Sequence, residues 1–304
     1  MNAGMVGEYA FEEFADIPAE VEQAAEFWYR NPIIRASDLV LAISQSGETA
    51  DTLAAVREAI QKGTWVSGLC NVVGSTIARE TGSGIYLHAG PEISAASTKA
   101  FTCRLAVLPM VALKFGRCAT LSCSRGREIA EAIESIPELV ERVLEQNDVI
   151  AKDAERWAET QSAFFIGRGY QFSVALEGAL KLKEISYIHA EGYHATELKH
   201  GPIALLEDGI PVVALLNEGP GKEKTIGNVH ECAARGARTV GVITEGDTDT
   251  ASLLDSVIEV PACPDFVAPV PTAVTLQLLS CHVARTRGCA IDQPRNLAKS
   301  VTVE

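Results

Sequence analysis

The position of Lys299 marks it as a candidate for covalent chemistry. It lies in the segment 292–304, after a turn at Pro294 and before the β-branched run Val301-Thr302-Val303. An unprotonated lysine amine attacks carbonyl carbons, so a lysine held in a specified local setting can form an imine. The segment taken alone is equally compatible with a solvated lysine in a loose chain end.

Two hydroxyl-rich loops each precede a helical pattern. The first, Ser44-Gln45-Ser46-Gly47-Glu48-Thr49, follows an apolar run that is typical of a buried strand. Hydroxyls, a glycine and the N–H groups of a helix N-terminus can bind a phosphate without a positive charge. Thr49 could also be a simple N-cap and Gly47 a simple turn. The second loop, 94–99, contains Ser97, and two such loops in one domain favour a polyhydroxylated anion.

Three charged residues lie one helical turn or two apart in the second half of the chain. Glu177, Lys181 and Glu184 are spaced i, i+4 and i+7, so they share one face of the predicted helix. Most such rows are exposed salt bridges. The small residues Gly178 and Ala179 indicate close packing here, and a carboxylate in a packed setting can act as a base toward a carbon acid.

The segment 189–202 is dense in titratable side chains and ends at the turn Gly201-Pro202. His200 is suited to acid–base chemistry near neutral pH. A surface loop with satisfied histidines is the alternative interpretation.

These side chains require a framework, and the sequence predicts one of alternating strands and helices. The order strand, helix, strand occurs once in each half, with similar lengths. It predicts an α/β fold with two doubly wound domains. Each domain would have three αβα layers and a parallel sheet, as in flavodoxin-like folds. The first unit comprises a strand at 38–43, a helix at 50–61 and a strand at 65–70, and the second a strand at 210–216, a helix up to 235 and a strand at 239–243.

We expect three segments: a first domain at 1–140, a second at 141–290 and a tail at 291–304 that closes the site. The stretch 124–159 has the composition of one or two linking helices, with a helix start at Pro137. Residues 4–14 have a helical pattern where a doubly wound domain would open with a strand. We therefore expect the first domain to lack its first strand.

Composition excludes several classes of function. The formal net charge of −14 disfavours nucleic acid and anionic membranes as partners. No apolar run reaches the length of a membrane span and no signal peptide is visible, so we expect a cytoplasmic protein. None of the eight cysteines forms a CxxC pair and the six histidines are scattered, so we expect reduced thiols, no metal and no cofactor.

Taken together, the motifs resemble the sugar isomerase (SIS) half of the glutamine–fructose-6-phosphate aminotransferase family. The resemblance follows the family's order along nearly the whole chain, and its last three motifs are specific to the family. The matching motifs are SQSGETADTL at 44–53, STKAFT at 97–102, ALEGALKLKEISYIHAE at 175–191, ELKHGP at 197–202 and DQPRNLAKSVTVE at 292–304.

The resemblance implies a role for each matching residue. Lys299 would form an imine with a ketose carbonyl, Glu184 would move a proton between carbons 1 and 2, and Lys181 would support Glu184 or the enediol charge. His200 would open the sugar ring and would come from the neighbouring subunit, and Ala298 would line the site. The remaining contacts to the sugar phosphate would come from Ser44, Gln45, Ser46, Thr49, Ala95 and Ser97.

The resemblance also implies an activity and partners. We expect conversion of fructose 6-phosphate to glucosamine 6-phosphate when ammonia is supplied, within amino-sugar (UDP-GlcNAc) synthesis, by a homodimer. The family's glutaminase domain and its Cys-Gly-Thr-Ser loop have no counterpart here, so a separate glutaminase would supply the ammonia. The alternatives are a weakly active sugar-phosphate-binding module and, less favoured, a deglycase or phosphosugar deaminase.

Overall fold

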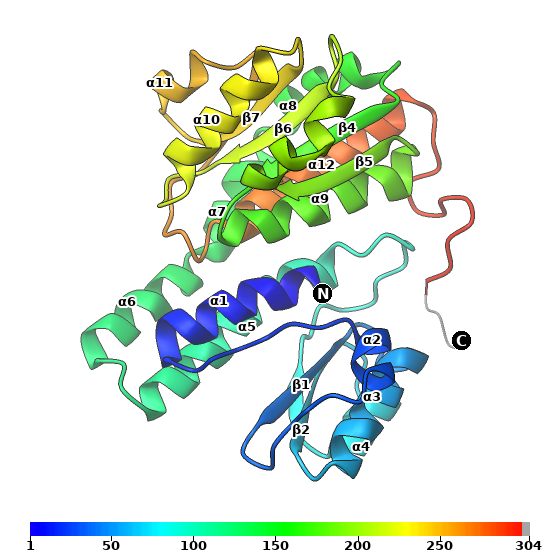
Figure 1. Ribbon diagram of the computed structural model, residues 1–304, viewed down its shortest axis with the longest axis vertical. Helices are drawn as coiled ribbons and strands as arrows, with labels where there is room; N and C mark the ends of the chain where they lie inside the picture. The colour runs from blue at the N-terminus through cyan, green and yellow to red at the C-terminus, as the bar shows by residue number, and fades with distance from the viewer. Residues whose placement is uncertain (300–304) are drawn as a thin grey trace.

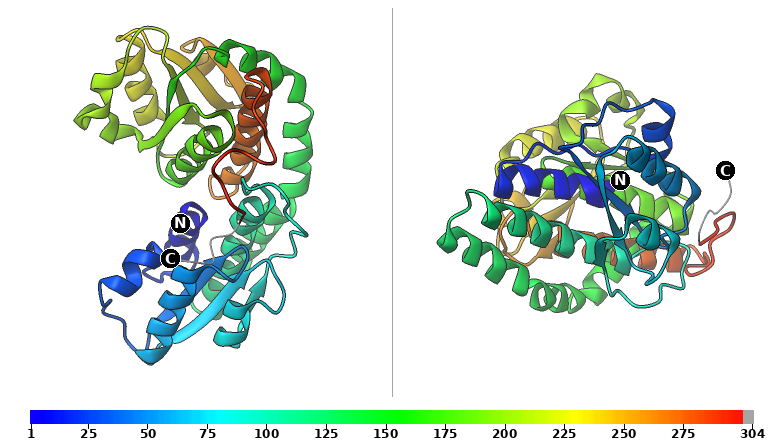
Figure 2. Two further views of the ribbon diagram at one scale, coloured as in Figure 1. Left: turned by 90° about the vertical axis from the view of Figure 1, so that its right-hand side faces the viewer. Right: turned by 90° about the horizontal axis from the view of Figure 1, so that it is seen from below.

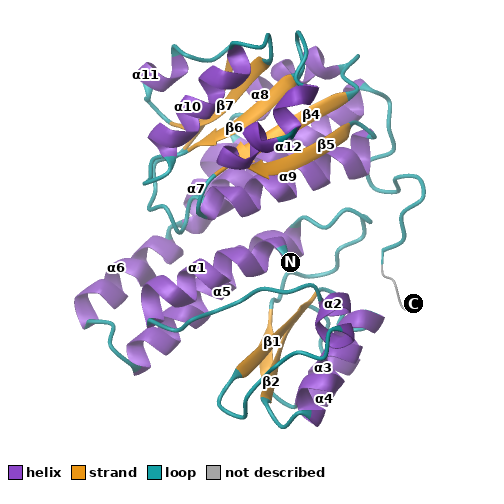
Figure 3. Ribbon diagram, viewed as in Figure 1, coloured by secondary structure: helices purple, strands orange, loops and turns teal. Residues whose placement is uncertain are grey.

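The computed structural model describes residues 1–299 and contains two parallel sheets, one in each α/β unit (Figures 1 and 3). The first has the strand order β1-β2-β3 and the second the order β5-β4-β6-β7-β8. Every strand pair is parallel. The prediction of two doubly wound domains with parallel sheets is therefore confirmed.

The first unit has helices on both faces of its sheet. A small apolar cluster joins the sheet to α2, α3 and α4 on one face, and the long helices α1 and α5 cover the other. Its elements are α1 (Asn2–Ala15), α2 (Ala24–Tyr29), β1 (Leu39–Ser44), α3 (Ala50–Gln61), β2 (Trp65–Cys70), α4 (Thr76–Thr81), β3 (Gly84–Tyr86) and α5 (Lys99–Cys118).

Three further helices lead from the first unit to the second. They are α6 (Cys123–Glu134), α7 (Ile136–Leu144) and α8 (Asn147–Ala154), followed by the short helix η1 (Glu155–Trp157). Pro137 lies in the first turn of α7, as its fixed φ favours. Helix α6 packs against α5, whereas α7, which contains our proposed division at residue 140, packs against α12.

The second unit follows the same plan with five strands. Side chains of β4 alternate between two cores: Ala163 and Phe165 face α9 and α12, and Phe164 and Ile166 face α10 and η2. Its elements are β4 (Ser162–Gly167), α9 (Tyr170–Ser186), β5 (His189–His194), η2 (Ala195–His200), η3 (Pro202–Leu205), β6 (Pro211–Leu216), α10 (Lys222–Ala233), β7 (Arg238–Thr244), α11 (Thr248–Ala251), β8 (Ser256–Val260) and α12 (Pro269–Thr286).

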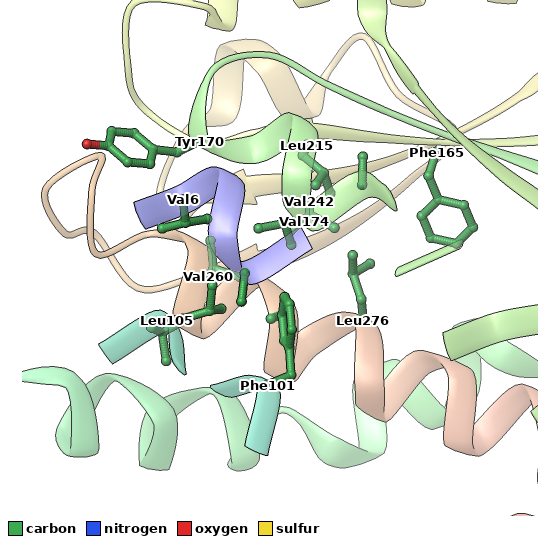
Figure 4. Close-up of a cluster of buried hydrophobic side chains, with 14 of the residues drawn as sticks. Val6, Phe101, Leu105, Phe165, Tyr170, Val174, Leu215, Val242, Val260 and Leu276 are labelled. Atoms are coloured by element: carbon green, nitrogen blue, oxygen red, sulfur yellow. The ribbon is translucent and has the colours of Figure 1, made fainter. Parts of the chain in front are cut away.

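The largest apolar core belongs to both units (Figure 4). Val6 of α1 and Leu105 of α5 lie in the same cluster as Val174 of α9 and Leu276 of α12. Close approach of α9 and α12 depends on Gly178, where an added Cβ would lie 2.4 Å from a methyl group of Leu276. The two units are thus joined by a continuous helical layer rather than by a flexible linker.

None of the helices within residues 1–299 combines the length and the apolar character that crossing a membrane requires.

Candidate active site

The loop 44–49 leaves the carboxyl end of β1 and enters α3. Its own hydroxyls shape it: the Gly47 N–H donates to Ser44 Oγ at 3.0 Å, and the Glu48 N–H donates to Ser46 Oγ at 3.2 Å. Because both oxygens act here as acceptors, both hydroxyl hydrogens can still be donated to a ligand. The loop therefore presents donors at the strand ends, where open α/β sheets bind ligands.

Glycine is required at position 47 for two reasons. Its φ of 69° lies in the left-handed region, and an added Cβ would lie 2.0 Å from Ser75 Oγ. Thr49 occupies the N-cap position of α3, yet its side chain makes no capping hydrogen bond. The Thr49 hydroxyl therefore does not cap the start of α3, so Thr49 is not the simple N-cap of the alternative interpretation.

Asn71 connects this loop to the next one along the sheet edge. Its N–H donates to the Gln45 carbonyl at 3.2 Å. Its side-chain oxygen accepts from the Ala89 N–H at 2.9 Å, and its amide nitrogen donates to the Gly90 carbonyl at 2.9 Å. The loop after β3 is therefore fixed relative to the loop after β1.

The loop after β3 carries Glu92, whose buried carboxylate organises the start of α5. It accepts from Ser97 Oγ at 2.9 Å and from the Thr98 N–H at 2.6 Å. Burial opposes ionisation, but the hydrogen bonds from Thr98 and Ser97 and the charge of Lys299 together lower the pKa of Glu92. Glu92 is thus held as an anion directly before the predicted sugar-contacting residues Ala95 and Ser97.

Lys299 lies against this loop. Its ammonium is 3.3 Å from Glu92 Oε2 and donates to the Ser94 carbonyl at 2.6 Å. These contacts join residues more than 200 positions apart in the chain, so the setting of Lys299 is specified by tertiary structure. Ala298, beside it, is exposed, and the residues after Lys299 that belong to the final motif lie outside the described part of the chain.

The tail before Lys299 runs from the second unit down to the first (Figure 2, left). The Ala95 N–H donates to the Asp292 carbonyl at 3.2 Å. The guanidinium of Arg295 lies 4.1 Å from the centre of the Tyr187 ring, and the Arg295 N–H donates to the Tyr187 hydroxyl at 2.9 Å. The tail thereby ties the loop after β3 to the C-terminal end of α9.

The charged row on α9 is buried rather than exposed. The Lys181 ammonium lies 2.6 Å from Glu184 and 3.4 Å from Glu177, and only 4% of Lys181 is accessible to solvent. The predicted shared helix face is therefore confirmed. Ile185, next to Glu184, packs in one small apolar cluster with Ala96, so the Glu184 end of α9 lies beside the loop that holds Lys299.

His200 is not brought to this group of residues within one chain. It is exposed at the end of η2, and among the described residues it forms no hydrogen bond or ion pair with Glu184 or Lys299. Helix η2 packs on the face of the second sheet opposite α9, because Ala195 and Leu198 belong to the core shared with α10.

Sequence reasoning missed two charged residues of the site. Glu92 stands in a Gly-Pro-Glu turn before a helix, and an acidic residue at a helix N-terminus was the available signal. Arg104 lies one turn into α5, and its Nε is buried without a hydrogen-bond partner among the described residues. Burial lowers the pKa of Arg104, while the charges of Glu177 and Glu92 act in the opposite direction. An arginine among apolar helix positions was its only signal.

The described residues contain no cluster of three or more His, Cys, Asp or Glu side chains with the arrangement of a metal site.

The fold and the loop at the sheet edge define a class of protein. The family model for the SIS domain matches residues 1–114 and 158–287, one segment in each unit. The chain therefore belongs to the SIS domain family.

Comparisons with individual proteins identify the group within that family. The glutamine–fructose-6-phosphate aminotransferase (isomerizing) of Chlorobaculum tepidum is 52% identical over 303 residues, which is 100% of this chain and 49% of the relative. The solved C-terminal domain of glucosamine-fructose-6-phosphate aminotransferase from Francisella tularensis is 39% identical, with a TM-score of 0.93 over 96% of this chain and 83% of that one. The resemblance inferred from the motifs is confirmed by these likenesses, although the chain spans about half the length of the curated relatives that it matches.

A second solved structure is similar in fold. The glucosamine-6-phosphate deaminase of Thermotoga maritima is 25% identical, with a TM-score of 0.80 over 99% of this chain and 86% of that one.

Proposed function

We propose that this chain is a ketose–aldose isomerase module that acts on fructose 6-phosphate and, when ammonia is present, produces glucosamine 6-phosphate. The observation that carries the proposal is the position of Lys299. Its amine is held by Glu92 and Ser94 beside the end of α9 that presents Glu184. A sugar-phosphate sensor would need neither an anchored lysine nor a carboxylate paired with a buried lysine.

The chemistry assigns one task to each group. The phosphate binds at the loop 44–49, through the hydroxyls of Ser44, Ser46 and Thr49 and the N–H groups at the start of α3. The amine of Lys299 attacks carbon 2 of the open-chain ketose, and water leaves as the imine forms. Glu92, within 3.3 Å of that amine, is placed to accept the proton that the ammonium must lose first.

Proton transfer completes the reaction. Ammonia replaces Lys299 on carbon 2 and releases the lysine. Glu184 then takes a proton from carbon 1 and returns it to carbon 2, while the hydroxyl proton on carbon 1 passes to the nitrogen. The 2-imine thereby becomes a 2-amino aldose. Lys181, 2.6 Å from Glu184, holds that carboxylate in place and balances its charge. The remaining predicted contacts, Gln45, Ala95, Ser97 and Ala298, surround the sugar.

The partners follow from the same proposal. His200 lies on the other face of the second sheet from α9, so we propose that it serves the site of a second copy, which makes the active form a homodimer. We propose that a separate glutaminase supplies ammonia, and that the protein works in the cytoplasm in amino-sugar synthesis.

Trapping the imine tests the proposal. Purified chain is incubated with fructose 6-phosphate and borohydride, and the adduct is mapped by mass spectrometry. We expect one reduced sugar phosphate on Lys299, and glucosamine 6-phosphate when ammonium replaces borohydride. Lys299→Arg keeps the charge but cannot form the imine, so both signals should disappear while the circular dichroism spectrum is unchanged.

Two results would contradict the proposal. Labelling that persists in Lys299→Arg, or that maps to Lys181, would assign the imine to another residue. Tight binding of fructose 6-phosphate without product or adduct would instead identify a sugar-phosphate-binding module.

A further inference from the structure

The second unit contains a cavity of about 410 Å³ at the carboxyl edge of its sheet. Ligand sites in proteins have volumes of about 300–1,000 Å³. The strand order reverses at this point, because β4 leads through α9 to β5 on one side while β6 pairs with its other side. Ligands bind doubly wound sheets at such topological switch points. We name this space, which lies between the loops 167–171 and 217–222, the second-unit cavity.

The repeat within the chain relates this cavity to the phosphate loop of the first unit. In the first unit β1, α3 and β2 follow one another, and β1 pairs with β2. In the second unit β6, α10 and β7 do the same. The loop 217–221 therefore occupies the position that the loop 44–49 has in the other copy of the unit.

Two side chains of this cavity have buried polar atoms without partners. Gln171 is 5% exposed, and neither its amide nitrogen nor its amide oxygen has a hydrogen-bond partner among the described residues. Arg168 Nε is also buried and unpartnered, although Nη2 of the same guanidinium donates to Asn228 Oδ1 at 3.1 Å. An unsatisfied buried polar group costs about 1–3 kcal/mol, so a ligand that pairs these atoms gains affinity from them.

One end of the cavity favours an anion. The N-termini of α9 and α10 both meet it, and neither N-cap, Gly169 or Gly221, provides a side-chain hydrogen bond to its helix. At the start of α9 the Gln171 and Phe172 N–H groups already donate to backbone carbonyls, and at the start of α10 the Lys222 N–H does the same. The Tyr170 N–H forms no backbone hydrogen bond among the described residues, and the positive ends of the dipoles of these 17- and 12-residue helices favour acceptor oxygens at this end of the cavity. Arg168 adds a positive charge beside them.

The rest of the lining favours donors on the ligand. Glu12 and Glu13 of α1 and Asp265 contribute carboxyl oxygens. Glu13 already accepts from the Tyr170 hydroxyl at 2.8 Å and lies 3.6 Å from the guanidinium of Arg125, so part of its charge is balanced within the protein. Lys222 adds no net attraction for an anion, because Glu218 and Asp247 lie 2.9 and 2.7 Å from its ammonium. Carboxylates repel a simple anion but attract an ammonium group. The lining therefore suits a molecule that carries both charges.

We propose that the second-unit cavity binds an amino-sugar phosphate, a phosphate monoester of a hydroxylated carbon chain that also bears an ammonium group. The phosphate lies against the N-termini of α9 and α10 and Arg168. The ammonium group faces Glu13 and Asp265, and Gln171 pairs with a hydroxyl group. This site is separate from the one that contains Lys299, and the proposal does not depend on catalysis there.

The test measures binding with the first site disabled. In a Ser46→Ala, Thr49→Ala background, isothermal titration calorimetry with glucosamine 6-phosphate should report one site. Arg168→Met should weaken this binding by about tenfold or more, as expected for a lost charged hydrogen bond. Gln171→Leu should weaken it as well. The matched controls are Arg235→Met and Gln161→Leu, because both residues are exposed on the same unit, and they should leave binding unchanged.

Two further probes identify the chemistry. Glucose 6-phosphate lacks the ammonium group and inorganic phosphate lacks the sugar as well, so each should bind more weakly than glucosamine 6-phosphate. Hydrogen exchange should slow in the segments 167–172 and 217–225 when glucosamine 6-phosphate is added, a readout that needs no substitution that could disturb folding.

Specific outcomes would overturn the proposal. They are the absence of binding in the Ser46→Ala, Thr49→Ala background, or protection that is confined to the loop 44–49. Equal binding of the three probes would refute an amino-sugar phosphate as the ligand. Failure of the imine test leaves all of these measurements unaffected, so the two proposals can fail independently.

Discussion

At the residue scale, Glu92 and Lys299 form one ion pair although they lie more than 200 positions apart in the chain. Neither side chain forms another ion pair among the described residues. The 3.3 Å contact between them joins the loop after β3 to the C-terminal tail. A carboxylate that accepts hydrogen bonds from Ser97 and Thr98 and an ion pair from Lys299 stabilises the fold only while it is ionised.

Glu92→Gln should therefore reduce stability in a pH-dependent way. The pKa of Glu92 is lowered from 4.5 in the folded state, so its contribution is complete above about pH 4.5 and is lost as the pH falls through the folded value. We expect a lower Tm for Glu92→Gln at pH 7 and a smaller difference at pH 3, measured by thermal denaturation. Glu159→Gln, an exposed control, should show no such trend, and an equal loss at both pH values would argue against the ionised form.

For Asp265, ionisation affects stability in the opposite direction from Glu92. Burial, with the neighbouring charge of Glu13, raises the pKa of Asp265 from 3.8 to about 6. Ionisation of this carboxyl therefore destabilises the folded state. This destabilisation is absent below about pH 3.8 and complete above about pH 6. Asp265→Asn removes that cost and should stabilise the protein at pH 8 by about 1–2 kcal/mol, after allowance for solvent screening of a partly exposed group.

The measurement for Asp265→Asn is denaturant unfolding at pH 8 and at pH 4. The stabilisation should shrink at the lower pH, and a variant that is less stable at pH 8 would show that the carboxylate makes a favourable contact instead.

At the element scale, the strand-to-helix turn after β1 is the part of the fold most directly linked to binding. Ser46→Ala with Thr49→Ala removes two hydroxyl donors without disturbing Gly47, whose conformation sets the turn. A hydrogen bond to a charged group contributes about 1.5–3 kcal/mol, so affinity for fructose 6-phosphate should fall by well over about tenfold. Calorimetry measures this, and a Tm close to that of the parent would show that the loss is not one of folding. Unchanged affinity would show that the loop 44–49 does not bind the phosphate.

Elements with strong local patterns could be predicted from the sequence. Helix α3 and strand β2 have the predicted bounds, and β1, β6 and β7 differ by a residue or so, because apolar runs between polar loops define a buried parallel strand. The helix after the second hydroxyl loop, α5, continues to Cys118 despite Pro109 within it. Contacts with α1 stabilise that helix where its local pattern is weak.

Other elements lack a local signal. Strand β5 carries His189, Glu191 and His194, and its polar composition is that of a loop; pairing along β4 makes it a strand. The contacts of Lys299 with Glu92 and Ser94, of Arg295 with Tyr187 and of Gln171 with the second-unit cavity all depend on residues far apart in the chain. Residue types and spacing indicated which side chains could do chemistry, but tertiary packing decides which of them meet.

At the scale of the whole molecule, the two units share one apolar core through α1, α5, α9 and α12. The tail adds a second connection from α12 back to the loop after β3. Each unit contributes side chains to the Lys299 site, so neither unit alone would contain it. If a second copy of the chain also contributes side chains to this site, as we propose, its exposed His200 completes the site.

Mixing variants tests that arrangement. His200→Ala and Lys299→Ala should each be inactive alone. If His200 acts in the site of a neighbouring copy, mixed dimers contain one site with both residues intact, so mixing the two variants under exchange conditions should restore part of the activity. Each variant mixed with itself is the control. An absence of rescue, with exchange verified by mass spectrometry of the dimers, would mean that each site is built from a single chain.

The position of α1 also has a consequence for synthesis on the ribosome. Helix α1 is made before α9, yet the two are neighbours in the finished protein: Asn2 donates to Glu177 at 2.8 Å across 175 positions of the chain. At about 5–20 residues per second, α9 follows α1 by on the order of 10–35 s. During that interval Val6, Ala10 and Phe14, which are buried in the finished protein, lack part of their cover. The emerging chain is thus expected to offer chaperones a transient apolar helix, and release of the chain before α9 is complete would leave that helix free to aggregate.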